Sequence, residues 1–361
     1  MPINASLLAS YFRPAPAHFE VPYFILGSRR PQGYVAGTDS SHQDVLIFDE
    51  VSGVTAYRAG WVVTDPANRV VYKVRSEISL SYVMPTLRFP SELPYRIELA
   101  RALYRRMRVA RRTTYAHRYV KPVLVHPRQI AAQESEIADY QATRQFLNSI
   151  YALPGTLFLR DGRLFAENYP GPSAVDSLYR LMVARGVRAV GVVKSGKLVE
   201  VLRPYARALR ARQGSAPFAF AVSREHLLQA YGGGGSNPPA ALTLRHGASG
   251  NACGGVGALR FAFCPAMDVL FVLEFNLYDL RQLRPLVSSG MSLQAWWRNR
   301  NKGETSPVFS WDIFPLVEPQ DWHDLFLPVL ENLVYCGQTE TELGLYPRAL
   351  AEAHNYVKLR R

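Results

Sequence analysis

The feature that most constrains the fold is an early series of short apolar segments separated by turn residues. Between residues 34 and 80, segments rich in Val, Ile, Thr, Tyr and Trp alternate with turn residues such as Ser52-Gly53 and Asp65-Pro66. This pattern is typical of β-strands joined by hairpins. The expected strands are 34–38, 45–48, 54–63 and 69–80. The sequence therefore predicts an antiparallel meander at the start of the fold.

The middle of the chain alternates between helical and strand patterns. Pro127 precedes and Pro154 follows a helical pattern over residues 129–150. The pattern then continues with a strand at 155–159, a helix at 174–185, a strand at 189–193 and a helix at 198–212. Strands that are separated by helices usually pair in parallel. We therefore expect an α/β fold in which the meander and these parallel strands share one mixed sheet flanked by helices.

The remaining segments suggest a single large domain with insertions. We expect helices at 92–112, at 324–334 and after Pro347, and paired strands at 258–263 and 269–276. Prolines and glycines interrupt residues 1–30, which we interpret as an N-terminal arm. Residues 31–361 then form the domain, and the Gly-rich stretch around 231–257 is an insertion within it.

The charge of the chain points to a polyanionic partner. The 42 Lys and Arg residues outnumber the 29 Asp and Glu residues, for a net charge of +13. Such an excess argues against an enzyme for small neutral metabolites and favours nucleic acid, with an acidic membrane surface second. Only six of these basic residues are Lys, and Arg suits bidentate contacts with phosphate. A compositional bias of the genome would produce the same excess and is the alternative.

We expect a cytoplasmic protein that does not enter the membrane. Residues 1–13 lack the basic start and apolar core of a signal peptide. The most apolar stretch, 259–277, is interrupted by Arg260, Asp268 and Glu274, which predicts strands and not a membrane span. The three cysteines form no Cys-X-X-Cys pair, so we expect reduced thiols and neither a disulfide framework nor a cysteine zinc site.

Two acidic residues that follow predicted strands are candidate metal ligands. Asp39 comes directly after the strand at 34–38, and Asp161 follows the strand at 155–159 within Leu-Arg-Asp-Gly. Carboxylates that converge at strand ends bind Mg²⁺ or Mn²⁺, which prefer oxygen ligands and promote phosphodiester hydrolysis. Asp-Ser and Asp-Gly are also common in turns, so a purely structural role is the alternative for each.

A carboxylate from the preceding helix would complete this cluster. We choose Glu136, and Glu134 and Asp139 are the alternatives at neighbouring positions of the same helix. Near the end of the chain, Tyr346-Pro347 predicts a helix start with Pro at its first position. His354 lies two turns along that helix, roughly 12 Å from Tyr346 by helical rise, and is a further candidate.

Three basic segments are candidates for DNA contact. Arginines spaced by three or four residues share one face of the helix at 92–112, and the helix at 198–212 repeats the pattern. A third segment, which begins at Trp296, places aromatic residues beside cations, a composition suited to stacked single-stranded bases. The candidate residues are Arg101, Arg105, Arg108, Arg112, Arg203, Arg207, Trp297, Arg298 and Arg300. Solvated arginine faces and a buried Trp pair are the alternatives.

The order of these motifs resembles the NurA family of nucleases. That family has a strand ending in Asp-Gly-Ser, a second Asp-Gly after an apolar strand, a Val-Val-Lys strand and a closing Gly-Tyr-Pro…Ala-His helix. The matching patches here are 35–41, 157–162, 190–194 and 346–354. The chain departs from the pattern at Ser40, which replaces the glycine, and by one extra residue between Gly344 and Tyr346.

The resemblance implies an RNase H-like core and a set of site residues. Asp39, Asp161, His354 and a helix carboxylate would bind Mn²⁺ or Mg²⁺, with Tyr346 beside them. The spacing from Glu136 to Asp161 is longer than is usual in the family, which leaves open which helix carboxylate takes part. Phe48-Asp49-Glu50 also ends a predicted strand, and we prefer Asp39 to Asp49 because Ser41 keeps the third position of the motif.

The function implied by the resemblance is metal-dependent DNA cleavage. It would comprise single-strand endonuclease and 5′–3′ exonuclease activity in DNA end resection and double-strand break repair. A homodimer would act with a HerA-type hexameric ATPase, and Lys194 or a second metal ion would stabilise charge on the phosphate. A catalytically weak DNA-binding adaptor subunit of a translocase is the first alternative. An unrelated RNase H-like resolvase is the second.

Overall fold

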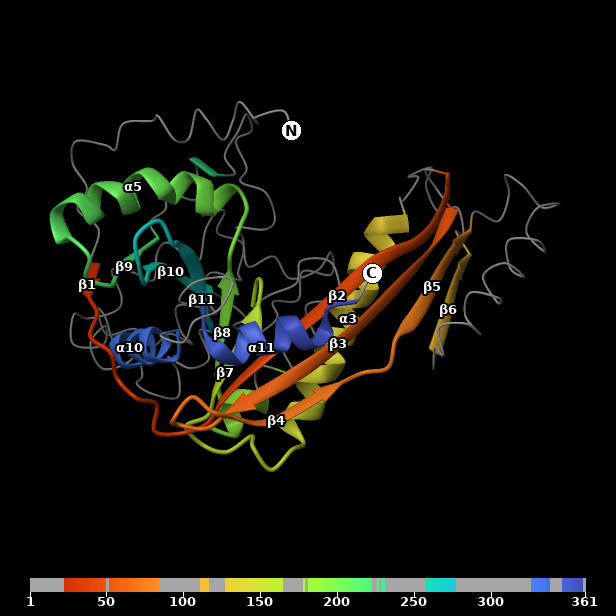
Figure 1. The fold of residues 1–361 in the computed structure, drawn as a ribbon, viewed down its shortest axis with the longest axis horizontal. Coiled ribbons are helices and arrows are strands. Elements are labelled where there is room, and N and C mark those ends of the chain that lie inside the picture. Colours follow the sequence, from red (N-terminus) through yellow and green to blue (C-terminus); the bar gives the residue numbers. More distant parts are fainter. Residues whose placement is uncertain are drawn as a thin grey trace, which may run out of the picture.

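The structure is a computed structural model, and an 11-stranded mixed sheet lies at its centre (Figure 1). It describes residues 23–49, 52–84, 111–116, 127–164, 178, 181–222, 226, 229–230, 258–276, 326–337 and 346–359. The strands are β1 (Tyr23–Ile25), β2 (Val35–Asp49), β3 (Ser52–Thr64), β4 (Val70–Arg75), β5 (Ser79–Met84), β6 (Arg111–Ala116), β7 (Leu157–Asp161), β8 (Arg188–Val193), β9 (Phe218–Ala221), β10 (Ala258–Cys264) and β11 (Phe271–Asn276). The helices are α3 (Pro127–Leu147), α5 (Lys197–Gln213), α10 (Leu327–Cys336) and α11 (Arg348–Val357).

The strand order is β1-β9-β10-β11-β8-β7-β2-β3-β5-β6, with β4 paired to β3 outside this path. Strand β3 runs antiparallel to β2, β4 and β5, which confirms the meander at the start of the fold. Strands β2, β7 and β8 are parallel neighbours, as the alternation of helices and strands predicted. The mixed α/β class is therefore confirmed.

Strand β2 is longer than the sequence pattern indicated, and this corrects one expectation. The segment Asp39-Ser40-Ser41 is not a turn but lies within β2, where Asp39 pairs with Gly60 and Ser40 with Ala59. The antiparallel ladder with β3 continues past these polar residues, because one face of this strand borders a polar cleft instead of the core. The parallel partner β7 pairs with β2 only as far as Thr38 and Arg160. Asp39 therefore lies where the parallel pairing stops.

Two further expectations differ from the structure. Part of the predicted N-terminal arm, Tyr23–Ile25, is strand β1 and pairs with β9, which the sequence pattern did not reveal. Arg112 is not on a helix with the other arginines, because Arg111–Ala116 forms strand β6. Thr113, Thr114 and Tyr115 favour extended backbone, and the segment pairs in parallel with β5. Residues 1–22, 92–110 and 231–257 lie outside the described part of the chain.

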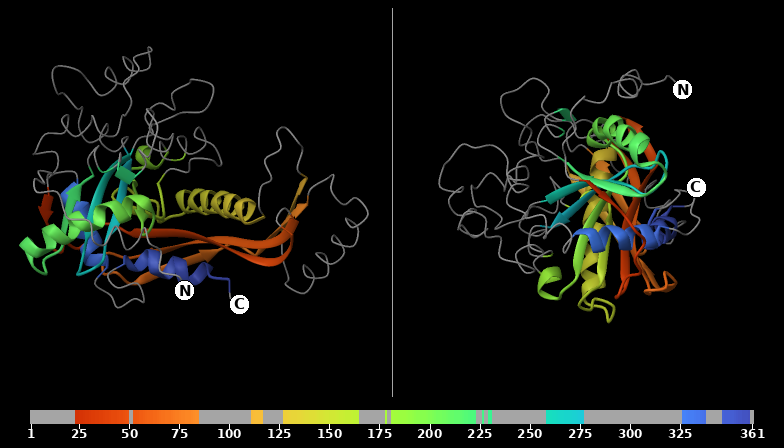
Figure 2. Two further views of the ribbon diagram at one scale, coloured as in Figure 1. Left: turned by 90° about the horizontal axis from the view of Figure 1, so that it is seen from above. Right: turned by 90° about the vertical axis from the view of Figure 1, so that its left-hand side faces the viewer.

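Helices cover both faces of the sheet, and side-chain alternation along each strand separates two cores. Leu157 and Leu159 of β7 pack with α10 and α11 on one face. Phe158, between them, packs with α3 on the other face, where α5 also covers the strands β9 and β10. Figure 2 shows α3 and α11 on opposite sides of the long β2–β3 ribbon. Where β2 and β7 pair, successive residues therefore face α3 and α11 in alternation.

Candidate metal centre

Three residues that are distant in the sequence meet where β2 and β7 stop pairing. Among the described residues, Asp39, Asp161 and His354 form a group whose candidate ligand atoms all lie within 4.8 Å of one another. The Nδ1 atom of His354 lies 2.9 Å from an oxygen of Asp39 and 3.9 Å from an oxygen of Asp161. The three residues come from β2, β7 and α11.

The strand register explains why the two aspartates meet. The last parallel pair of β2 and β7 is Thr38 with Arg160, so Asp39 and Asp161 are the next residues along the two neighbouring strands. Side chains alternate between the two faces of a sheet, and both aspartates fall on the face that α11 covers. The sheet therefore presents two carboxylates to the same helix from adjacent strands.

Helix α11 lies directly on the strands that carry Asp39, and this places His354. A Cβ atom on Gly37 would lie 2.5 Å from the carbonyl oxygen of Ala349, so only glycine permits this approach. At the other end of the helix, Arg58 of β3 donates hydrogen bonds to the carbonyls of Val357 and Lys358. A cation that binds the last carbonyls of a helix stabilises its C-terminus. Close backbone contact and this cap together fix the position of His354.

The charge on Asp39 is destabilised by its surroundings. Asp39 is buried, and burial raises the pKa of its carboxyl, which the hydrogen bond from His354 opposes and the nearby Asp161 reinforces. A buried carboxylate that lies beside a second carboxylate favours the binding of a cation, since the cation relieves both the burial and the repulsion. The electrostatics of Asp39 therefore suit a metal ligand.

Lys194 and Tyr346 border the three residues. The ammonium nitrogen of Lys194, which follows β8, lies 2.7 Å from Asp161 and 4.9 Å from the ring centre of Tyr346. Tyr346 is fully buried directly before α11. Burial, followed by the charges of Asp161 and Asp39, raises the pKa of its hydroxyl well above the usual value. Tyr346 therefore stays protonated at neutral pH.

The three residues lie in an open cleft of about 510 Å³ that polar side chains from both faces of the sheet line. Glu136 and Asp139 of α3 border the same cleft, but both pair with Arg160, at 3.0 and 2.7 Å. Glu134 instead accepts a hydrogen bond from Tyr57 at 3.0 Å. The structure thus brings Glu136 to the cleft without adding it to the group formed by Asp39, Asp161 and His354.

The donor set and its spacing fit a hard divalent cation. Two carboxylates and one imidazole are ligands that Mn²⁺ accepts, and Mg²⁺ accepts the carboxylates readily. In octahedral geometry with bonds of 2.0–2.1 Å, neighbouring ligand atoms are about 2.9 Å apart and opposite ones about 4.1 Å. The distances from His354 to Asp39 and to Asp161, 2.9 and 3.9 Å, fall close to these values. The residues present therefore fit such an ion.

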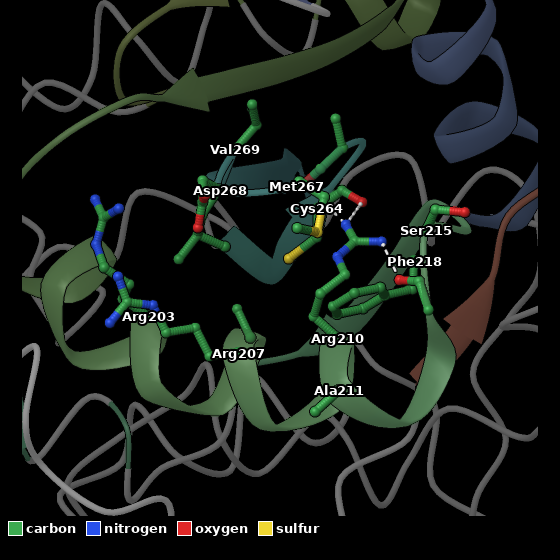
Figure 3. Close-up of a pocket in the computed structure, with 14 residues that line it drawn as sticks. Arg203, Arg207, Arg210, Ala211, Ser215, Phe218, Cys264, Met267, Asp268 and Val269 are labelled. Carbon is green, nitrogen blue, oxygen red and sulfur yellow. Dashed lines mark hydrogen bonds between the residues drawn. The ribbon is translucent and has the colours of Figure 1, made fainter.

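The arginines of α5 that were predicted to contact DNA line a different pocket (Figure 3). Arg203 and Arg207 border a cavity of about 550 Å³ between α5 and the turn that joins β10 to β11. Their neighbour Arg210 donates hydrogen bonds to the carbonyls of Cys264 and Ala266 and so anchors the helix to β10. The predicted contact residues Arg101, Arg105, Arg108, Trp297, Arg298 and Arg300 lie outside the described residues. DNA contact by these residues stays a prediction.

Sequence reasoning missed the residues that hold the site together. Arg160 precedes Asp161 and binds the α3 carboxylates, and Thr38 precedes Asp39 and donates a hydrogen bond of 2.5 Å to Asp139. A basic residue within an apolar strand, as in Leu-Phe-Leu-Arg-Asp, is the one signal that could have singled out Arg160. Nothing in the pattern around Gly37 or Arg58 indicates contact with a helix some 300 residues later.

Replacing Asp39 by Asn should stabilise the metal-free protein, increasingly so at higher pH. The folded-state pKa of Asp39 is raised above 3.8, so its ionisation opposes folding. The free energy of unfolding of the wild type therefore decreases as pH rises from the pKa of Asp39 in the unfolded chain to its higher pKa in the folded protein. We expect the advantage of Asp39→Asn to grow over this window and then level off, as measured by urea unfolding in EDTA.

Asp65 provides a control of opposite sign for this measurement. Its pKa is lowered because hydrogen bonds from Arg69 outweigh the effect of burial. Relative to wild type, Asp65→Asn should therefore become less stable as pH rises through the lowered pKa of the wild-type residue. An Asp39→Asn variant that is less stable than wild type at pH 7 would contradict the electrostatic account of Asp39.

None of the described helices has the length and apolar character of a membrane span.

Comparison with known proteins finds distant structural likenesses. No protein-family model and no curated protein match the chain. The NurA nuclease from Sulfolobus solfataricus matches at 9% identity and a TM-score of 0.40, covering 93% of this chain and 82% of that one. A NurA structure with manganese matches at 10% identity and a TM-score of 0.31, covering 92% and 88%.

Argonaute from Marinitoga piezophila, in complex with a 5′ OH guide RNA, matches at 10% identity and a TM-score of 0.28. It covers 91% of this chain and 30% of that one. These likenesses fall below the similarity that establishes a shared fold. The functional proposal therefore rests on the residues of the site.

Proposed function

We propose that this chain is a metal-dependent nuclease that hydrolyses DNA phosphodiesters. The observation that carries the proposal is the convergence of Asp39, Asp161 and His354 from three distant segments beside Lys194. The net charge of +13 favours a polyanionic substrate. The motif resemblance to NurA supports DNA as that substrate.

Asp39, Asp161 and His354 would hold the cation. A bound Mn²⁺ or Mg²⁺ supplies Lewis acidity, which activates a water molecule and stabilises negative charge on the phosphate. The contact between His354 and Asp39 holds their two ligand atoms 2.9 Å apart, and the proton that these atoms share would leave when the ion binds. The burial of Asp39 limits competition from solvent at the same position.

Lys194 would act on the phosphate, while the buried Tyr346 would act on the aspartates. In hydrolysis the water oxygen forms the new bond to phosphorus, the bond to the leaving oxygen breaks, and that oxygen takes up a proton. The ammonium of Lys194 lies at the mouth of the site beside Asp161 and is about one-third exposed, so it can approach a phosphate oxygen. The neutral hydroxyl of Tyr346 provides a hydrogen-bond donor next to the two aspartates.

The motif resemblance supports a proposal for the biological setting. We propose single-strand endonuclease and 5′–3′ exonuclease activity in DNA end resection, within an RNase H-like fold. We further propose a cytoplasmic homodimer that docks on a HerA-type hexameric ATPase. The arginines predicted to contact DNA would guide the strand to the cleft, and their phosphate contacts would make binding strongly dependent on salt.

The test is incubation of the purified chain with end-labelled single-stranded DNA, with Mn²⁺ or with EDTA. Cleavage that requires Mn²⁺ is the expected result. Binding without cleavage would overturn the proposal and favour an adaptor subunit. Cleavage of four-way junctions with little cleavage of linear single strands would favour a resolvase instead.

Mn²⁺ should also stabilise the folded wild-type protein, because it binds a site that exists only in the folded state. At a free concentration 100 times the dissociation constant, the expected gain in the free energy of unfolding is about 2.7 kcal/mol. Thermal unfolding monitored by circular dichroism measures this gain. The gain should fall by about half or more in Asp161→Asn, because a tenfold loss of affinity leaves about 1.4 kcal/mol. An equal rise in both proteins would place the ion elsewhere.

A further inference from the structure

The carboxylates of the cleft form two sets, and Arg160 binds the set on α3, Glu136 and Asp139. Its Nε atom lies 2.7 Å from Asp139, and one terminal nitrogen lies 3.0 Å from Glu136. The other terminal nitrogen donates to the carbonyl of Arg163, and the guanidinium lies 4.7 Å from the ring centre of Tyr140. Arg160 and Asp139 are 5% and 2% exposed, so their ion pair is buried, whereas the side chain of Glu136 is 30% exposed.

The sheet itself separates the two sets. Thr38 and Arg160 are direct partners in the β2–β7 ladder, and both direct their side chains to Asp139 on the α3 face. Asp39 and Asp161 follow them by one residue and therefore face α11. Asp139 therefore accepts hydrogen bonds from Thr38 and Arg160 on one face of the sheet, and His354 lies on the other face.

A guanidinium in this position has the properties of a permanently bound cation. Arginine stays charged at any pH at which the protein folds, and its planar fork of donors suits two carboxylates at once. Removing it from a buried carboxylate leaves an uncompensated buried charge, which is strongly destabilising. Asp139 is therefore committed to Arg160 before any metal arrives, and the partly exposed Glu136 pairs with the same guanidinium.

We propose that Arg160 takes the place of a second divalent cation, so that the centre binds one metal ion per chain. In this arrangement Arg160, Glu136 and Asp139 are positioning residues that fix α3 against the carboxyl end of β7. They hold the strand residue that precedes Asp161 without contacting the ion. This inference rests on the proposed metal centre, and it makes Glu136 a partner of arginine instead of the metal ligand that the sequence suggested.

The test is the stoichiometry and affinity of Mn²⁺ binding to the full chain, measured by isothermal titration calorimetry and by electron paramagnetic resonance. Wild type should bind one ion per chain, with no spin coupling between ions. Glu136→Gln keeps the size of the side chain and a carbonyl acceptor for Arg160, so its Mn²⁺ affinity should stay within threefold of wild type. Asp161→Asn is the matched control and should lose binding at least tenfold.

The outcomes separate the two proposals. Two ions per wild-type chain, or a loss of tenfold or more in Glu136→Gln, would overturn the role of Arg160 while leaving the metal centre in place. No binding to wild type would overturn the metal centre itself, and with it this inference. One ion per chain, with affinity lost in Asp161→Asn alone, supports both.

The variant Arg160→Met tests directly whether the guanidinium takes the place of a second cation. Without the guanidinium, the α3 carboxylates become available, and we expect a second, weaker Mn²⁺ site formed by Glu136 and Asp139. A folded Arg160→Met protein that still binds a single ion would contradict the proposal. If circular dichroism shows that this variant does not fold, the Glu136→Gln measurement decides.

Discussion

Replacing Asp161 by Asn should lower Mn²⁺-dependent cleavage of single-stranded DNA by about three orders of magnitude. The substitution removes a charge from the metal group and the carboxylate partner of Lys194, while the shape of the side chain is kept. Charge stabilisation by a bound metal is worth several kcal/mol. At about 1.4 kcal/mol for each factor of ten, a loss of about 4 kcal/mol corresponds to this decrease.

The matched control for this substitution is Asp268→Asn. Asp268 is an exposed residue in the turn between β10 and β11, and Asn tolerates its positive φ of 58°. This variant should cleave DNA as wild type does. Rates are to be compared by quenched time courses on an end-labelled oligonucleotide. Wild-type rates in folded Asp161→Asn would remove Asp161 from the site.

Replacing Gly37 by Ala should both destabilise the protein and disrupt the site. The added methyl group would lie 2.5 Å from the carbonyl oxygen and 2.6 Å from the carbonyl carbon of Ala349, which are backbone atoms that cannot rotate away. Either α11 moves off β2 or β2 bends. Overpacking of this kind costs about 1–3 kcal/mol in the free energy of unfolding. His354 would move away from Asp39, and we expect cleavage to fall by about tenfold or more, as for other displaced catalytic groups.

Gly27→Ala is the comparison for this effect. A Cβ atom on Gly27 would meet only the carboxylate of Glu331, at 3.0 Å, and that side chain can rotate. Urea unfolding should therefore show a small change for Gly27→Ala and a large one for Gly37→Ala. Equal stability and equal activity of the two variants would show that close contact between α11 and β2 does not position His354.

The local sequence pattern was sufficient to predict most strands and helices, because their formation depends on residues that are close in the sequence. The apolar runs at β7 and β8 and the helical period of α5 were predicted close to their observed bounds. The sequence did not predict that β2 continues through Asp39-Ser40-Ser41, because this continuity depends on the long ladder with β3. Strand β6 was missed because its backbone is set by pairing with β5, against the helical spacing of its arginines.

The site was predictable only as a set of candidates. Asp39 and Asp161 were found as acidic residues near strand ends, but their meeting depends on the register of β2 against β7 across some 120 residues. The place of His354 depends on the close packing of α11 at Gly37. Arg160 was not singled out, because its role depends on where α3 lies relative to the sheet. A single sequence contains none of these distances.

The most direct measurement is the anomalous diffraction of crystals grown with Mn²⁺. We predict a strong anomalous peak within coordination distance of Asp39, Asp161 and His354, with Lys194 beside it. A peak at other residues, or none while His354 still bonds to Asp39, would contradict a metal centre at this position.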